Sequence, residues 1–252
     1  PGKYWRANVG GSLNLIEAAT EAGVKHFVFS STCATYGDQD NVVLDEDSVQ
    51  LPINAYGASK RAIEDMLRDF EASTGLQSVI FRYFNVAGAD PEAEVGEYHQ
   101  PETHLIPLML DAIDGKRPAL TIFGTDYATP DGTCIRDYVH VMDLVDAHVL
   151  GVKWLQADKG SQVFNLGTGS GFSVREVVAA SRAVTNREVP MTVGARRPGL
   201  APGHCRIHCP EYLGFQLIAF GIGGEHASDT EVQVIERNYS QAGPGKMFVD
   251  EG

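Results

Sequence analysis

The first part of the chain alternates between stretches with helical spacing and stretches with the composition of strands. Four apolar residues recur at steps of three or four and share one face of a predicted amphipathic helix: Val9, Leu13, Ile16 and Ala19. Gly23 ends that helix, and the apolar run at 25–30 predicts a strand. The polar, acidic residues 38–54 predict a loop. A helix at 55–73 and a second buried strand at 78–84 follow.

This alternation of helix and strand predicts parallel βαβ units and an α/β fold. After Asn85 the chain is polar and rich in glycine and proline up to His104, which indicates a long loop. Further helices are predicted at 105–115, 140–155 and 174–184, and further strands at 119–123 and 162–166. Ser173 and Glu176 form a capping box ahead of the last helix. From Leu200 onward no such order is visible.

Composition and charge exclude several classes of protein. With 252 residues, 43% of them hydrophobic, the chain can bury a sizeable core. Its formal net charge of -13 argues against a nucleic-acid-binding surface and against binding to anionic membranes. No apolar run approaches the about 18 residues that a membrane helix needs. Four cysteines are typical of a protein of the reducing cytoplasm and not of a disulfide scaffold.

A tyrosine and a lysine stand four residues apart near the start of the helix predicted at 55–73. Tyr56 and Lys60 therefore share one face of that helix. Thr32 follows the strand at 25–30, and a strand end can present hydroxyls to a phenol on the next helix. A phenol has a pKa of about 10, and a neighbouring ammonium favours the phenolate, which can then act as a base nearer neutral pH. The three side chains form a candidate proton-transfer set.

Several motifs, in this order, resemble those of the extended short-chain dehydrogenase/reductase superfamily. They are SSTCATYG at 30–37, YGASK at 56–60 and FRYFN at 81–85. Further runs, at 122–144, 163–174 and 195–199, are similar to those of the UDP-glucose 4-epimerase family within that superfamily. The resemblance covers about residues 4–199.

The resemblance implies an incomplete Rossmann-like doubly wound parallel sheet with a smaller substrate-binding lobe. The family begins with a strand, a G-x-x-G-x-x-G turn and a helix that hold the NAD pyrophosphate, and matching Asn8 to the family implies that roughly 90 residues of that pattern are absent here. We expect the C-terminal part of the NAD-binding domain at 1–85 and a nucleotide-sugar-binding region at 86–199, with the helix at 140–155 packing back on the former. Residues 200–252 depart from the family pattern, as a shifted reading frame would cause.

In that family a tightly held NAD oxidises carbon 4 of a UDP-hexose, and the hydride then returns to the other face of the ketone. The resemblance implies an isomerase of galactose metabolism that interconverts UDP-glucose and UDP-galactose. Its catalytic residues are Tyr56 as acid/base, Lys60 to lower the pKa of Tyr56, and Thr32 to bind the reacting hydroxyl. Residues expected along NAD are Asn8, Ser30, Tyr56, Lys60 and Tyr83. Residues expected to hold the substrate are Thr32, Asn85, Leu105, Phe123, Arg136, Tyr138 and Arg197.

Plainer structural roles remain open for many of these residues. Thr32 can cap a turn, and Arg136 and Arg197 can form surface ion pairs. The rest can pack in the core or end an element: Asn8, Tyr83, Asn85, Leu105, Phe123 and Tyr138. Four possible zinc donors follow in the tail, His204, Cys205, His208 and Cys209. Because their spacing matches no closed zinc site, we expect no metal.

Other functions also remain open. Sugar-nucleotide dehydratases of the superfamily carry an acidic pair where this chain has Cys33 and Ala34, so we do not expect elimination. SSTCATYG also resembles UDP-arabinose/UDP-xylose 4-epimerases, and a chain without the glycine turn can be an inactive nucleotide-sugar-binding remnant. For the complete protein we expect a homodimer, as is common in the family, formed by the helices at 5–22 and 55–73.

Overall fold

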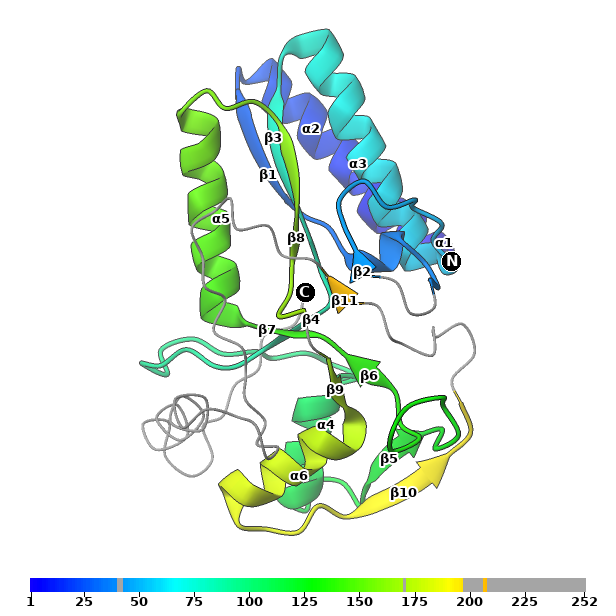
Figure 1. Ribbon diagram of the computed structural model, residues 1–252. Helices are drawn as coiled ribbons and strands as arrows, with labels where there is room; N and C mark the ends of the chain where they lie inside the picture. Colours follow the sequence, from blue (N-terminus) through cyan, green and yellow to red (C-terminus); the bar gives the residue numbers. More distant parts are fainter. Residues whose placement is uncertain (40–42, 170, 197–205, 208–252) are drawn as a thin grey trace. The chain divides into compact units, whose positions relative to one another are not determined.

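The computed structural model describes residues 1–39, 43–169, 171–196 and 206–207, and these fall into two compact units. The first unit comprises Pro1–Phe84, Val145–Gly167 and the two residues at 206–207, and the second comprises Asn85–Leu144 together with 168–196, within the described residues. None of the described helices has the length and hydropathy that crossing a bilayer requires. Figure 1 shows the elements of both units with the labels used below.

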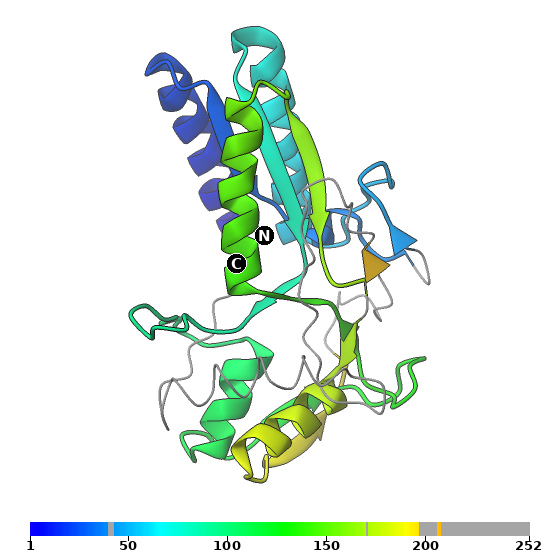
Figure 2. The ribbon, with the colours of Figure 1, turned by 60° about the vertical axis from the view of Figure 1, so that its left-hand side comes forward.

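A three-stranded parallel sheet forms the centre of the first unit. Its strands lie in the order β1 (His26–Ser30), β3 (Gln77–Tyr83) and β8 (Gln162–Leu166). Helices α2 (Gly11–Glu21) and α3 (Ala55–Thr74) cover one face of this sheet, and the part of α5 (Val141–Gln156) that belongs to this unit covers the other (Figures 1 and 2). The α/β class and the parallel sheet that we predicted are confirmed.

The middle strand β3 is buried on both of its faces. Ile80 packs in one apolar cluster with Ile16 of α2 and with Ile63 and Leu67 of α3. Phe81 points to the other face, where a Cβ on Gly151 of α5 would stand 3.0 Å from its ring. Burial on both faces explains why this strand lacks the polar alternation of a strand with one face in water. Each such buried side chain contributes about 1.5–3 kcal/mol to folding.

Helix boundaries in the first unit follow local signals. The Asn54 side chain caps α3 by accepting a hydrogen bond of 2.8 Å from the Gly57 N–H. Gly75, with φ of 74°, ends the same helix in the left-handed conformation that suits glycine. The first predicted helix corresponds to α2, but helical structure in the chain starts before α2. The short helix α1 (Gly2–Tyr4) and a π-helical segment, η1 (Trp5–Gly10), precede α2 without a break.

In its described residues the second unit contains two complete helices and three pairs of short strands. The helices are α4 (Leu105–Ile113) and α6 (Val174–Thr185). The pairs are β4 (Asn85–Ala87) with β7 (Tyr138–His140) and β5 (Leu120–Phe123) with β10 (Met191–Gly194), both parallel, and β6 (Ile135–Arg136) with β9 (Phe172–Ser173), which is antiparallel. Its core cluster includes Met109, Ile113, Leu120, Tyr138 and Val177. The capping box of Ser173 and Glu176 is confirmed by both reciprocal hydrogen bonds.

The predictions were least accurate for the shortest elements. Between the predicted strand at 119–123 and the predicted helix at 140–155 the structure contains two strands that were not predicted, β6 and β7. The helix predicted from His140 begins at Val141, because His140 ends β7. The predicted loop at 38–54 contains β2 (Val43–Leu44), which pairs with β11 (Arg206–Ile207). Strands of two to four residues have too few positions to display a period, so distant partners decide them.

Candidate active site

The first two turns of α3 hold the tyrosine and lysine singled out in the sequence. Lys60 donates a hydrogen bond of 2.9 Å from Nζ to the carbonyl oxygen of Ser30, at the end of β1. Its ammonium also lies 5.0 Å from the centroid of the Phe29 ring and 5.9 Å from that of Tyr56. Burial lowers the pKa of Lys60 below its ordinary value. The lysine is therefore fixed between the sheet and the tyrosine.

The Tyr56 phenol is partly buried beside Thr32. Burial, followed by the electrostatic effect of Tyr83, raises the pKa of Tyr56, and a hydrogen bond with the Thr32 side chain lowers it in part. We expected a neighbouring ammonium to lower the pKa of Tyr56, but in the structure this pKa is raised. The reason is that removal of water from the phenolate is the largest of the effects on this group. Thr32 itself is only 6% exposed, and the structure thus brings Thr32, Tyr56 and Lys60 together.

A 3-10 turn, η2 (Cys33–Thr35), explains how Thr32 is held. Thr32 Oγ1 caps this turn by accepting a hydrogen bond of 3.2 Å from the Ala34 N–H. Since a hydroxyl oxygen has two lone pairs and one proton, the same group can cap the turn and bond to Tyr56. The capping role and the contact with the phenol are compatible.

The residues expected along the cofactor lie at the edges of this cluster. Asn8 donates a hydrogen bond of 2.9 Å from Nδ2 to Ser59 Oγ, and Ser59 Oγ in turn donates to the Tyr56 carbonyl oxygen at 2.8 Å. The Ser30 hydroxyl lies 2.8 Å from Nε2 of His148 on α5. Tyr83 is the last residue of β3 and is 6% exposed. Asn8 and Ser30 therefore each bind a neighbouring element of the same unit.

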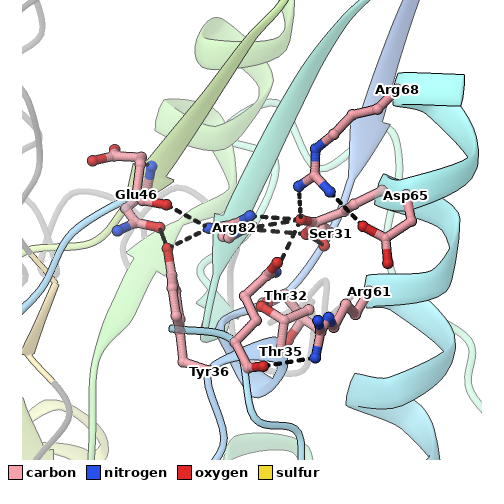
Figure 3. A network of polar contacts seen from close by, with 12 residues as sticks. Ser31, Thr32, Thr35, Tyr36, Glu46, Arg61, Asp65, Arg68 and Arg82 are labelled. Carbon is pink, nitrogen blue, oxygen red and sulfur yellow. Dashed lines mark hydrogen bonds and ion pairs between the residues drawn. The ribbon is translucent and has the colours of Figure 1, made fainter. Parts of the chain in front are cut away.

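A buried polar network lies directly behind Thr32. The Glu64 carboxylate accepts hydrogen bonds from Ser31 Oγ at 2.5 Å and from Arg82 Nη2 at 2.6 Å. Arg82 Nη1 donates to the Tyr36 hydroxyl at 2.7 Å, and that hydroxyl donates to Asn165 Oδ1 at 2.7 Å. Figure 3 shows the Arg82 guanidinium between Tyr36 and Ser31. The network joins α3, β3, β8 and the segment that follows β1.

Burial governs the ionisation of this network. It raises the pKa of Tyr36 to about 12, although Arg82 acts in the opposite direction. Burial also opposes the charge of Arg82, but the hydrogen bonds from Arg82 to Glu64 raise the pKa of the guanidinium. Glu64 is 0% and Arg82 is 2% exposed, so the structure holds a buried ion pair whose remaining donors and acceptors are bonded to neighbours.

The described residues expected to hold the substrate lie in the second unit, apart from Thr32. Asn85 and Tyr138 stand opposite each other in the β4–β7 pair, and Tyr138 is 6% exposed in the core cluster. Arg136, in β6, donates from Nη1 to its neighbour's carbonyl, Ile135 O, at 2.8 Å. Asp137, which stands between Arg136 and Tyr138 in the sequence, is buried. It accepts hydrogen bonds from the Thr168 hydroxyl at 2.7 Å and the Thr168 N–H at 3.0 Å.

Two further expected residues stand at the ends of elements in this unit. Leu105 is the first residue of α4 and packs against the core cluster, and Phe123 is the last residue of β5 and is 38% exposed. Arg197 lies outside the described residues, as do the four possible zinc donors at 204, 205, 208 and 209.

Several residues that build the site were not recognised as such from the sequence. Ser59 and His148 bind Asn8 and Ser30, and Glu64 and Arg82 support the segment that holds Thr32. One signal was available, because Glu64 stands four residues after Lys60 and a helix places such residues on one face. Its partner Arg82 is an arginine within a buried apolar strand, where a charge requires a counter-ion.

Comparison with known proteins gives the class to which this fold and site belong. Residues 1–167 match the model of the NAD dependent epimerase/dehydratase family, so the chain belongs to that family. It is 51% identical to the UDP-glucose 4-epimerase of Rhizobium leguminosarum bv. trifolii over 199 residues. These aligned residues make up 79% of this chain and 61% of that protein. The chain thus spans about three fifths of the length of such curated relatives.

Solved structures agree with this assignment. The UDP-glucose 4-epimerase of Brucella ovis in complex with NAD superposes with a TM-score of 0.83 at 42% identity, over 99% of this chain and 74% of that one. The UDP-glucose-4-epimerase of Stenotrophomonas maltophila, with bound NAD and formylated UDP-arabinopyranose, gives a TM-score of 0.80 at 33% identity, over 96% of this chain and 71% of that one.

Proposed function

We propose that this chain carries the catalytic groups of an enzyme that inverts carbon 4 of a UDP-hexose with NAD and so interconverts UDP-glucose and UDP-galactose. The observation that carries this proposal is the hydrogen bond between Thr32 and the partly buried phenol of Tyr56, with Lys60 one helical turn further along α3. A hydroxyl, a phenol and an ammonium in this arrangement can move one proton to and from a sugar hydroxyl. The relatives named UDP-glucose 4-epimerase support the choice of substrate.

In this mechanism Tyr56 is the acid/base and Thr32 orients the reacting hydroxyl. Tyr56 removes the proton from the hydroxyl on carbon 4, and later returns it, while the hydrogen bond from Thr32 favours the phenolate. When bound, NAD supplies the reversible hydride acceptor, and the positive charge of its oxidised ring favours the phenolate as well. Inversion needs no further acid, in agreement with the uncharged Cys33 and Ala34 beside Thr32.

The protein groups around Lys60 suit a dinucleotide ribose. An ammonium has three N–H donors, and within the described residues one of those of Lys60 binds the Ser30 carbonyl, so two remain for ribose hydroxyls. Asn8, Ser30 and Tyr83 would line the rest of the cofactor. A buried lysine whose pKa is lowered by burial gains from such hydroxyl partners, because they solvate its charge.

For the nucleotide we propose residues of the region at 86–199 and its border. The set is Asn85, Leu105, Phe123, Arg136, Tyr138 and Arg197. Arginine suits the diphosphate because its planar guanidinium binds two oxygens at once. Under this proposal residues 1–85 complete an NAD-binding domain and 200–252 form an atypical tail.

The setting of the enzyme is part of the same proposal. We place it in galactose metabolism in the cytoplasm, in agreement with its few cysteines. The complete protein would be a homodimer through the helices at 5–22 and 55–73, where Trp5 and Leu15 are 43% and 58% exposed. Sedimentation equilibrium of the wild type and of Leu15→Glu tests this contact, and a wild-type monomer would exclude it for this chain.

The first experiment is turnover of UDP-galactose by the 252-residue protein with added NAD, with UDP-glucose measured by a coupling dehydrogenase. We expect turnover that Tyr56→Phe lowers by about 10²–10⁴-fold. Tyr98→Phe is the matched control, since Tyr98 is 86% exposed, and its rate should equal that of wild type. Equal loss in both variants would exclude Tyr56 as the acid/base.

A binding measurement separates an inactive remnant from an enzyme. If the purified chain takes up NAD at micromolar concentration, as measured by equilibrium dialysis, it retains a cofactor site. Without uptake of NAD and without turnover, the chain is a nucleotide-sugar-binding remnant, which binding of UDP would identify.

A UDP-arabinose/UDP-xylose 4-epimerase is the second candidate. It is favoured by the form of the SSTCATYG motif at 30–37 and by the UDP-pentose bound in the Stenotrophomonas maltophila protein. The same assay with both substrate pairs decides between them. A kcat/KM for the pentose pair above that for the hexose pair would replace the first choice.

A further inference from the structure

The segment that leads into α4 gathers four side chains of the kinds that bind metal ions. Glu97, His99, Glu102 and His104 each bring one ligand atom to a common place, and these atoms all lie within 4.8 Å of one another. All four come from eight consecutive residues, and His104 is the N-cap residue, directly before the first residue of α4. The cluster is separate from the tail donors considered in the sequence.

The distances within the cluster suit a single ion. Four ligands at about 2.0–2.1 Å from a tetrahedral metal stand about 3.3 Å from one another. His99 Nδ1 lies 3.6 Å from Glu102 Oε1, and His104 Nδ1 lies 3.8 Å from Glu97 Oε1 and 2.8 Å from Glu102 Oε1. These three contacts lie within about 0.5 Å of the tetrahedral separation. The other pairs of ligand atoms lie within 4.8 Å, so the side chains must close around the ion when it binds.

The two imidazoles are also arranged to converge. The rings of His99 and His104 have centroids 5.0 Å apart and planes inclined by 33°. Their side chains are 42% and 26% exposed, whereas those of Glu97 and Glu102 are 14% and 17% exposed. The carboxylates thus lie deeper than the exposed His99, and an ion can reach the cluster from solvent.

Charge favours a cation at this place. The cluster contains two carboxylates, and the sequence has no lysine or arginine between Arg82 and Lys116. A divalent cation with two neutral imidazoles would neutralise the pair.

We propose that Glu97, His99, Glu102 and His104 form a binding site for a divalent transition-metal ion, of which zinc fits best. Imidazole and carboxylate together suit zinc and its neighbours, whereas calcium and magnesium prefer oxygen ligands alone. The ion replaces the contact between His104 and Glu102 and fastens the loop to the N-cap residue of α4. Its role is structural, because four protein ligands complete a tetrahedral shell.

The test is zinc binding by the untagged 252-residue protein after removal of metals with a chelator. Titration against a chromophoric zinc indicator should give one zinc per chain, and zinc should raise the midpoint of thermal unfolding. The double variant His99→Ala/His104→Ala should lose this site. Because His104 is the N-cap residue of α4, the milder variants His99→Ala and Glu102→Gln are tested as well, and each should bind zinc at least about 10-fold more weakly.

A second set of variants separates this cluster from the tail. His204→Ala/Cys205→Ser/His208→Ala/Cys209→Ser removes the tail donors and should leave the stoichiometry at one. Cobalt is a further probe, since a four-coordinate cobalt ion absorbs visible light. The proposal is overturned if no zinc binds at micromolar concentration. It is equally overturned if the tail variant loses the zinc or if His99→Ala and Glu102→Gln bind it as tightly as wild type.

Discussion

The Ser31 hydroxyl donates a hydrogen bond of 2.5 Å to Oε1 of Glu64, and both side chains are buried. Ser31 directly precedes Thr32, and Glu64 lies one turn beyond Lys60 on α3. The same carboxylate accepts two hydrogen bonds from Arg82 Nε and one from Nη2 on β3. One buried anion therefore fixes the relative positions of the segment that carries Thr32 and the helix that carries Lys60.

Substitution of Arg82 should be among the most destabilising changes in the first unit. Arg82→Met leaves Glu64 without its buried counter-ion, since the other cation near it, Arg68 at 3.6 Å, is half exposed. We expect this to lower the free energy of unfolding by about 3–5 kcal/mol. Urea unfolding followed by circular dichroism measures this loss. Asp65→Ala is the control, because the ion pair of Asp65 with Arg68 is about half exposed and such pairs contribute only about 0–1 kcal/mol.

The double variant Glu64→Leu/Arg82→Met distinguishes loss of a counter-ion from loss of packing. If the cost of Arg82→Met comes from the unpaired carboxylate, removal of that carboxylate should recover part of the stability. A single variant Arg82→Met within about 1 kcal/mol of wild type would show that Glu64 is neutralised or solvated in another way.

Gly57 is required by the close approach of α3 to the turn that follows Thr32. A Cβ at this position would stand 2.3 Å from the Ala34 carbonyl oxygen, so Gly57→Ala must displace the first turn of α3 and, with it, Tyr56. We expect a loss of stability of at least about 1 kcal/mol, although alanine is the better helix former by about that amount. Thermal unfolding measures the change.

Gly11→Ala is the matched substitution without a clash. Gly11 begins α2, and no atom lies within 4 Å of the place of its Cβ. Here alanine should raise the free energy of unfolding by up to about 1 kcal/mol. Changes of the same sign at both glycines would contradict the explanation by steric contact with Ala34.

Thr32→Val should shift the pH dependence of turnover to higher pH. The hydrogen bond from Thr32 lowers the pKa of Tyr56, which burial raises, so its removal raises that pKa further. Because the base form of Tyr56 is the phenolate, the rising limb of kcat against pH moves upward. Thr32→Ser keeps the hydroxyl and should retain the wild-type profile, and an unshifted profile in Thr32→Val would contradict this role.

His140 should make the protein sensitive to mild acid. Burial lowers the pKa of its imidazole from the ordinary 6.5 to about 4. Between these values the unfolded chain binds a proton that the folded chain does not bind, so stability present above pH 6.5 is lost as the pH falls to about 4. The loss amounts to about 3 kcal/mol at the lower limit.

Urea unfolding at pH 7 and pH 4 measures this loss in wild type and in His140→Asn. The asparagine oxygen can replace Nδ1 as the acceptor of the Met142 N–H, a bond of 3.2 Å in the structure. We expect the variant to lose about 3 kcal/mol less than wild type on acidification. His26→Asn is the control at an exposed histidine, and equal losses in all three proteins would assign the sensitivity to other groups.

Features that depend on near neighbours in the chain could be predicted from the sequence. The helical period placed Tyr56 and Lys60 on one face of α3, and the capping box at Ser173 set the start of α6. The apolar run at the centre of β3 predicted a strand buried on both faces. Each of these depends on residues within one or two turns or one strand, so local spacing is sufficient.

Features that depend on distant partners were decided by the tertiary structure. The strands β4 and β7 exist because Asn85 stands opposite Tyr138, and the network behind Thr32 needs Ser31, Glu64 and Arg82 from three separate segments. The direction of the Tyr56 pKa was likewise beyond the sequence. Spacing shows which groups can be near the phenol, but only packing determines how much water is removed from it, and that desolvation outweighs the hydrogen bond from Thr32.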